Sequence, residues 1–335
     1  MKLCYLNSPY WSHARTARAY KRCLESIVEV LRQPESADLV VLHDEPHRFH
    51  EYYTRYDCLR TKYVIAYSVW EASRLPVSFL AGLDLVQEVW TCSDYSKKAF
   101  AASCNNLHVI PHEVEPIGSR HKDDEVELLR KIKYDARNKY LITIANVWNR
   151  RKNVDTLVRL FKDLSVDFPK ARLIIKIGWR EAIPESYYSP QITAINDVLS
   201  AGQMECLYSI ASAYVSPHHS EGWGLCISDA LMRAVPVIAT AYSGNLTFMN
   251  NDNAFAIPAI ERPIKESEEY HLFTRDMCWG EPSSRQLELA ICQVLDDTHT
   301  DLIAGKTSNG ARDMKQFSAL AIENQLKARI ASLHL

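Results

Sequence analysis

Two carboxylates stand eight positions apart around a short turn in the segment 220–229, which reads Ser-Glu-Gly-Trp-Gly-Leu-Cys-Ile-Ser-Asp. The apolar run 213–217 before the turn predicts a buried strand, and apolar residues at helical spacing after it predict a helix. The first N–H groups of a helix are unpaired and lie at the positive end of its dipole, so an anion binds there readily. The segment therefore predicts a strand, a tight loop and a helix start that suits an anionic ligand.

Glu221 and Asp229 lie on either side of this predicted anion position. Gly222 and Gly224 let the backbone approach a ligand closely. Glu221 precedes the helix and Asp229 lies about a turn and a half into it, so one carboxylate suits hydroxyls ahead of a diphosphate and the other suits hydroxyls behind it. A nucleotide sugar carries both sets of hydroxyls. An ordinary strand-to-helix turn with two solvated acids is the alternative that the spacing leaves open.

Three consecutive cations, Arg150, Arg151 and Lys152, stand between a predicted strand at 140–145 and a predicted helix. Cations at the end of a strand neutralise a diphosphate leaving group and so substitute for a metal ion. A solvated basic turn is the alternative.

These motifs resemble those of the retaining glycosyltransferases of family 4, which have the GT-B fold. The segment from Glu221 to Asp229 resembles the acid-x7-acid motif of that family, although the family usually has glutamate at both ends. The segment 146–155 is similar to the family's basic donor motif, and 243–249 is similar to the small-residue loop that follows the acidic motif. Further similar segments, at 70–76 and 88–93, occur in the family's order.

The resemblance implies roles for individual residues. Glu221 would hold the transferred sugar, Lys152 and Arg151 would bind the diphosphate, and Asp229 would bind the ribose. The rest of the implied donor-binding set is Arg150, Gly222, Trp223, Gly224, Leu225, Ser243, Gly244 and Asn245. On the acceptor side, Glu71 or His43 would assist the reacting hydroxyl, with a structural role for His43 as the alternative.

The implied activity is a retaining, hexosyltransferase-like reaction from a UDP- or GDP-linked sugar to a hydroxyl of a glycan or lipid-linked acceptor, in polysaccharide or glycoconjugate biosynthesis. Neither a metal nor another cofactor is expected. A catalytically inactive nucleotide-sugar-binding subunit of a glycan assembly complex is the main alternative, because Asp229 departs from the family motif and the loop 7–12 has no glycine. A different GT-B enzyme, such as a phosphorylase or an epimerase, is a third interpretation.

A chain of 335 residues with alternating strand and helix patterns predicts the α/β class, with two Rossmann-like doubly wound domains facing a cleft. The expected divisions are an acceptor-side domain at 1–115, a polar linker at 116–124, a nucleotide-sugar-binding domain at 125–315 and a helix at 316–335 that returns to the first domain. The apolar face that begins at Ala17 and continues to Leu31 predicts a single helix.

Composition excludes several other classes of protein. A net charge of −2 gives no basic excess for nucleic acid, and no run of 18 apolar residues predicts a membrane span. The nine cysteines contain no Cys-x2-Cys pair, as expected for reduced thiols of a cytoplasmic protein. A basic stripe suggests peripheral contact with the anionic inner face of a membrane or with a phosphorylated acceptor, and a solvated helix face is the alternative. The stripe consists of Arg15, Arg18, Lys21 and Arg22.

Overall fold

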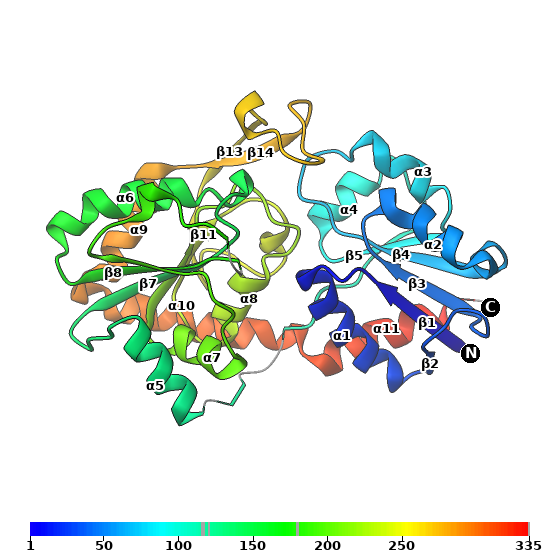
Figure 1. Cartoon of the computed structure of the whole chain (residues 1–335), viewed down its shortest axis with the longest axis horizontal. Coiled ribbons are helices and arrows are strands. Elements are labelled where there is room, and N and C mark those ends of the chain that lie inside the picture. The colour runs from blue at the N-terminus through cyan, green and yellow to red at the C-terminus, as the bar shows by residue number, and fades with distance from the viewer. Residues whose placement is uncertain (115–117, 120, 179–180, 334–335) are drawn as a thin grey trace. The chain divides into compact units, whose positions relative to one another are not determined.

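The computed structural model describes residues 1–114, 118–119, 121–178 and 181–333. These residues form two units, each built on a six-stranded sheet (Figure 1). The first unit takes in residues 1–114, 271–278 and 316–333 of the described chain, and the second takes in the described residues between 118 and 270 together with 279–315. The predicted α/β class with two doubly wound sheets is confirmed.

The sheet of the first unit has the order β2-β1-β3-β4-β5-β6, and its strands pair in parallel. The central strand β3 is buried along its whole length, which is typical of parallel sheets covered by helices on both faces. The strands are β1 (Lys2–Asn7), β2 (Glu29–Leu31), β3 (Leu39–His43), β4 (Tyr63–Tyr67), β5 (Glu88–Thr91) and β6 (Leu107–Val109). The helices are α1 (Trp11–Glu25), α2 (Phe49–Arg55), α3 (Leu80–Leu83), α4 (Asp94–Phe100) and α11 (Ala319–Ala331).

The sheet of the second unit has the order β12-β11-β10-β7-β8-β9 and is also parallel. Its strands are β7 (Lys139–Ile144), β8 (Ala171–Lys176), β9 (Ile192–Ile195), β10 (Ala211–Ser216), β11 (Val237–Thr240) and β12 (Phe255–Ile257). Its helices are α5 (Lys122–Lys131), α6 (Val154–Asp167), α7 (Ala201–Ser209), α8 (Leu225–Met232), α9 (Ser284–Leu295) and α10 (Thr300–Asp313). A separate two-stranded sheet joins β13 (Ala259–Pro263) to β14 (Cys278–Pro282).

The last helix, α11, belongs to the first unit and packs on α1. Arg329 on α11 donates from Nε to Oε1 of Glu88 at 2.7 Å, and Glu88 is only 1% exposed. The N–H of Val114 donates to the carbonyl of Phe317 at 2.9 Å. The C-terminal segment therefore supplies a charge partner and a main-chain hydrogen bond to residues far earlier in the chain.

The predicted single helix from Ala17 to Leu31 is wrong. α1 ends at Glu25, and residues 29–31 form β2, which pairs in parallel with β1 at the edge of the sheet. Ile27 and Val28 lie between them; β-branched residues suit a strand at least as well as a helix, so the apolar face continued past the end of the helix.

The predicted linker at 116–124 overlaps α5, which begins at Lys122. Residues 116, 117 and 120 of that prediction, and residues 334–335 of the predicted final segment, lie outside the described residues. The structure also places 271–278 with the first unit, although the residues before and after it belong to the second. The other predicted domain boundaries stay predictions.

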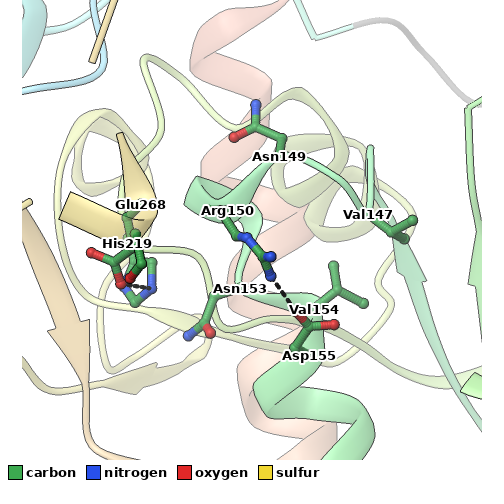
Figure 2. A pocket seen from close by; sticks show the side chains of 9 residues that line it. Val147, Asn149, Arg150, Asn153, Val154, Asp155, His219 and Glu268 are labelled. Carbon is green, nitrogen blue, oxygen red and sulfur yellow. Dashed lines mark hydrogen bonds and ion pairs between the residues drawn. The ribbon is translucent and has the colours of Figure 1, made fainter. Parts of the chain in front are cut away.

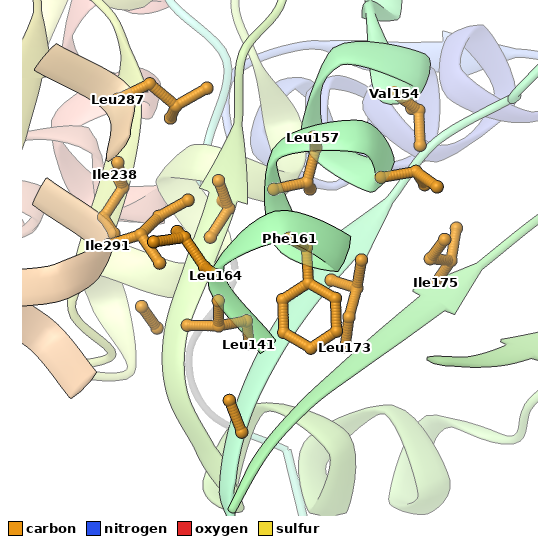
Figure 3. Packing of buried hydrophobic residues seen from close by; sticks show 14 of the residues in the cluster. Leu141, Val154, Leu157, Phe161, Leu164, Leu173, Ile175, Ile238, Leu287 and Ile291 are labelled. Atoms are coloured by element: carbon orange, nitrogen blue, oxygen red, sulfur yellow. The ribbon is translucent and has the colours of Figure 1, made fainter. Parts of the chain in front are cut away.

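The core of the second unit lies between its sheet and the helices α6 and α9 (Figure 3). α6 buries one continuous stripe made of Val154, Leu157, Val158, Phe161 and Leu164. The stripe follows helical spacing, so the sequence pattern that predicts the helix is also the pattern that packs it. Because α6 begins directly after the basic loop, this packing fixes where that loop leaves the sheet.

We expect Phe161→Ala to lower the free energy of unfolding by about 3–5 kcal/mol, because Phe161 is fully buried and its removal leaves a cavity. Chemical unfolding followed by circular dichroism measures the change. Val166→Ala, on the same helix at a side chain that is 80% exposed, is the control and should change stability by less than about 0.5 kcal/mol. Equal effects of the two substitutions would contradict the packing described above.

Candidate active site in the second unit

The strand order of the second unit reverses between β10 and β7. The chain passes from β7 to β8 on one side of this point and from β10 to β11 on the other, so the loops that follow β7 and β10 diverge there. Ligands of open α/β sheets bind beyond the carboxyl ends of the strands at such a reversal. The loop after β7 contains the predicted basic residues 150–152, and the predicted motif 220–229 begins in the loop after β10 and continues into α8.

The basic loop is fastened to the acidic loop through the main chain. Residues 150–152 form a single 3₁₀ turn, capped by the Asn149 side chain, which accepts from the N–H of Arg151 at 3.1 Å. The carbonyl of Arg151 accepts from the N–H of His219 at 2.8 Å, and Asn153 Nδ2 donates to the carbonyl of Pro217 at 2.9 Å. These bonds hold the two loops in register before any side-chain charge is considered.

Glu221 is a buried carboxylate held between two cations. Lys152 Nζ lies 2.6 Å from Oε1 of Glu221, and Arg151 Nη1 lies 3.1 Å from Oε2. Burial alone would raise the pKa of Glu221, but the charges of Lys152 and Arg151 outweigh it and lower the pKa to about 2. The structure therefore brings the first acid of the motif together with two of the three predicted cations. The third, Arg150, pairs with Asp155 at 2.9 Å.

The backbone of Glu221 is fixed by the loop that follows β11. Its N–H donates to Ser243 Oγ at 2.7 Å, and its carbonyl accepts from the N–H of Gly244 at 2.8 Å. A side chain at Gly244 would bring its Cβ within 1.8 Å of the Gly222 carbonyl oxygen, so the close approach of the two loops requires glycine. The amide of Gly244, a residue that the resemblance assigns to donor binding, is thus engaged with Glu221.

Ser243 has φ 77° and ψ −149°, a backbone conformation that is almost restricted to glycine. The strain is offset by the hydrogen bond between its hydroxyl and Glu221. Backbone strain of this kind concentrates at functional sites, where the surrounding structure enforces it.

Gly224 has φ 92° and lies at the start of α8, where its left-handed conformation turns the chain into the helix. Trp223, predicted to bind the donor, is 2% exposed, packs against Phe248 and donates to Ser228 Oγ, so it belongs to the core beneath the loop. Leu225, the first residue of α8, is partly buried.

Asp229, the second acid of the motif, is 6% exposed, and its Oδ1 lies 4.0 Å from Nη1 of Arg233 one helical turn later. Arg233 also pairs with Glu205, to which it donates from Nε at 2.7 Å. The aspartate therefore sits in a buried charge network.

The side chain of Asn245 is fully buried and is used within the protein. Its Nδ2 donates to the carbonyl of Thr240 at 2.9 Å, and its Oδ1 lies 3.1 Å from Nε2 of His218. Burial lowers the pKa of His218 to about 4, so a neutral imidazole braces the loop at neutral pH. Sequence reasoning missed His218, although its position three residues before Glu221 is a signal that could have found it.

In the first unit, His43 is 1% exposed, and its Nδ1 lies 2.9 Å from the hydroxyl of Tyr5. Burial, followed by the neighbouring histidines His13 and His112, lowers the pKa of His43 far below its usual value. This geometry favours the structural alternative for His43 and argues against contact with a substrate.

His13, which sequence reasoning missed, stacks on His43 with ring centroids 5.3 Å apart, and its Nδ1 lies 3.9 Å from Oδ1 of Asp44. Glu71 is half-buried nearby. The pKa of Glu45 is raised first by the burial of Glu45 itself and second by the negative charge of Glu71. Imidazole and carboxylate groups therefore gather beyond the carboxyl ends of β3 and β4 in the first unit, and Glu71 is among them.

A cavity of about 310 Å³ lies beside the basic loop of the second unit (Figure 2). It is lined by Val147, Asn149, Arg150, Asn153, Val154, Asp155, His219, Ser267 and Glu268. Potential metal-ligand atoms of His219, Glu268 and Glu281 all lie within 4.8 Å of one another. However, Arg262 donates to both carboxylates at 2.6–2.7 Å, so a guanidinium already supplies the positive charge that a cation would bring.

Residues 127–260 match the family model described as glycosyl transferases group 1. No curated protein matches the sequence. Over these residues the chain is similar to the group 1 glycosyl transferases, and the chain as a whole has the GT-B fold.

Solved structures with a similar fold cover nearly the whole chain. Anabaena Alr3699/HepE, in complex with UDP and glucose, is 14% identical with a TM-score of 0.69, over 99% of this chain and 100% of that one. A glycosyltransferase from Rickettsia africae is 12% identical with a TM-score of 0.71, over 99% and 98%. WaaG, a glycosyltransferase involved in lipopolysaccharide biosynthesis, is 11% identical with a TM-score of 0.65, over 99% of each chain. At identities of 11–14%, the similarity to these structures shows that this chain shares their fold.

The lowered pKa of Glu221 makes stability depend on pH. Between about 4.5 and about 2 the folded carboxyl stays ionised while the unfolded one binds a proton, so stability falls as the pH falls through this window. We expect Glu221→Gln to be less stable than the wild type at about pH 6, and the difference to narrow toward about pH 3. Chemical unfolding at a series of pH values measures it.

Glu288→Gln, at an exposed carboxylate on α9, is the matched control. The difference in free energy of unfolding between this variant and the wild type should stay constant over the same pH range. If the free energies of unfolding of the wild type and Glu221→Gln differ by the same amount at every pH, the result would contradict the paired, ionised state of Glu221.

Proposed function

We propose that the protein transfers a sugar from a nucleoside diphosphate to an acceptor hydroxyl with retention of configuration. The observation that carries this proposal is the buried Glu221 carboxylate held by Lys152 and Arg151 at the reversal of strand order. Lys152 and Arg151 carry positive charge that suits a diphosphate, and the Glu221 carboxylate suits the hydroxyls of a sugar. A nucleotide sugar carries these two groups next to each other.

In this proposal Lys152 neutralises the charge that develops on the leaving diphosphate, and no metal ion is needed for that purpose. Glu221 accepts hydrogen bonds from the sugar hydroxyls. Asp229 is assigned to the ribose side, where its shorter side chain acts directly or through a water. The backbone of 222–225 and 243–245 shapes the donor site, and Glu71 is assigned to the acceptor side.

A UDP-linked sugar is the donor to test first, with a GDP-linked sugar second. The Anabaena protein was solved with UDP and glucose, and the pneumococcal O-GlcNAc transferase GtfA, 17% identical over 96% of this chain and 61% of that one with a TM-score of 0.61, was solved with UDP and GlcNAc. The proposed acceptor is a glycan or a lipid-linked glycan, in line with the lipopolysaccharide pathway of WaaG. We place the reaction in the cytoplasm.

A second candidate is a nucleotide-sugar-binding subunit without activity. Asp229 in place of glutamate and the engagement of the Gly244 amide with Glu221 favour it. This candidate predicts binding of nucleotide without turnover.

We expect Glu221→Ala and Lys152→Ala each to reduce sugar transfer by about a hundredfold or more, because each removes a charge aimed at the reacting region. Transfer from UDP- and GDP-sugars to a panel of glycan acceptors measures the loss. Nucleotide binding is followed in parallel by calorimetry.

Glu288→Ala and Lys170→Ala, both at exposed positions of the second unit, are the matched controls and should keep full activity. Full transfer by a folded Glu221→Ala protein would contradict the proposal. Nucleotide binding by a wild type that transfers nothing to any acceptor would favour the non-catalytic candidate.

In the structure the predicted basic stripe of α1 is only partly available. Lys21 Nζ donates to Asn7 at 2.9 Å, and Arg22 pairs with Glu113 at 2.6 Å. Arg18 is exposed, and Arg15 lies over the ring of Trp11 at 5.8 Å.

Tyr10 and Trp11, which begin this surface, are 65% and 68% exposed. Aromatic and basic side chains together suit the interface of an anionic bilayer, and we propose peripheral contact there, at the inner face of the membrane. None of the helices in the described part of the chain has both the length and the apolar character of a membrane span.

We expect the wild type to sediment with phosphatidylglycerol vesicles in low salt, and Arg15→Ala/Arg18→Ala to bind about thirtyfold more weakly, since each of the two basic residues contributes about 1 kcal/mol at an anionic surface. Arg55→Ala/Lys98→Ala, which removes two exposed cations elsewhere in the first unit, is the control. Equal binding by both double variants would contradict a specific contact of α1.

A further inference from the structure

The two cations that face Glu221 differ in how firmly the protein holds them. The side chain of Arg151 is 7% exposed, and its Nη1 donates both to the carbonyl of Ser220 at 2.5 Å and to Oε2 of Glu221 at 3.1 Å. Its main chain is bound on both sides, by Asn149 at the N–H and by His219 at the carbonyl. Arg151 is therefore part of the framework that carries the Glu221 loop.

Lys152 is held in a different way. Its side chain is 23% exposed, and it reaches Oε1 of Glu221 with one ammonium hydrogen bond of 2.6 Å. A lysine ammonium is a point charge on a flexible stem and can change partners by rotating its own bonds. A rotation of this kind disturbs no main-chain contact of the loop.

Moving Arg151 to another anion would have a larger cost. Its departure would leave the buried Ser220 carbonyl and one oxygen of Glu221 without the donor they now share, and unsatisfied buried acceptors are strongly destabilising. A buried carboxylate that loses both cations at once is worse still. The protein can release one of the two cations from Glu221, and Lys152 is the one that leaves at the smaller cost.

We infer that the two cations divide the work: Lys152 transfers from Glu221 to the diphosphate of the donor, whereas Arg151 remains on Glu221 and is a positioning residue for that carboxylate. This inference rests on the proposed function. When Lys152 leaves, Oε1 of Glu221 becomes available to a sugar hydroxyl, while Arg151 keeps the carboxylate ionised and oriented through Oε2. Diphosphate binding and exposure of the sugar-binding oxygen are thereby one event. Arg151, which the resemblance assigned to the diphosphate, does not bind it in this arrangement.

The test separates binding of the diphosphate from handling of the sugar. Calorimetry gives the dissociation constants of UDP, GDP and ADP for the full chain, and steady-state kinetics gives KM and kcat for the nucleotide sugar whose base binds. The variants are Arg151→Gln, Arg151→Lys and Lys152→Met, with Arg159→Gln as the matched control at an exposed arginine of α6. Thermal midpoints report whether each variant is folded.

We expect Lys152→Met to bind the nucleoside diphosphate about tenfold or more weakly, the usual effect of losing a charge-assisted hydrogen bond. Arg151→Gln should bind it within about threefold of the wild type but lose about a hundredfold in kcat with little change in KM, because the misplaced carboxylate acts on the sugar. Arg151→Lys should not restore kcat, since both hydrogen bonds to Ser220 and Glu221 come from Nη1, and a lysine side chain ends one bond short of that atom. Arg159→Gln should match the wild type.

Diphosphate affinity that falls equally in Arg151→Gln and Lys152→Met, or kcat restored by Arg151→Lys, would overturn this inference and leave the proposed function standing. A wild type that binds none of the three diphosphates would overturn the proposed function and this inference together. If Arg151→Gln does not fold, the milder Arg151→Lys variant decides between the two roles by its KM and kcat.

Discussion

A buried carboxylate that requires two cations is the interaction on which the site of the second unit depends. A charge taken out of water costs several kcal/mol unless it is paired, and Glu221, at 7% exposure, is paired on both of its oxygens. The cations come from the loop after β7 and the acid from the loop after β10. The pairing is possible only because those strands are neighbours in the sheet, with their carboxyl ends at the same edge.

The backbone around this carboxylate is held in conformations that are unfavourable by themselves. Ser243 occupies a region that normally belongs to glycine, Gly224 is left-handed, and Gly244 allows two loops to approach more closely than any side chain would permit. These conformations are enforced by buried hydrogen bonds, including those of Asn245 with His218 and Thr240. These conformations lower the stability of the second unit and at the same time fix the position of one carboxylate, as is common at functional sites.

The sequence predicted the elements that carry the site of the second unit, because the strands that end near 145 and 217 and the helices that follow them have regular apolar spacing, and the acidic and basic motifs lie directly at the ends of those strands. It failed where local pattern was ambiguous, as at Ile27 and Val28, whose shape suits either a helix or a strand. It could not assign Arg151 and Lys152 different surroundings, since neighbours in the chain carry the same local signal and only packing separates them. For the same reason it could not show that Trp223 faces the core or that His43 lies beneath His13.

The return of α11 to the first unit has a consequence for synthesis on the ribosome. Glu88 is buried in the first unit, and Arg329, which pairs with it, follows 241 residues later. At roughly 5–20 residues per second, translation needs about 10–50 s to cover that distance. During this interval the first unit holds a carboxylate without that partner, whereas most of the second unit is already complete. The first unit is therefore synthesised before most of the second, but it is complete only after α11 has been made and has packed against α1.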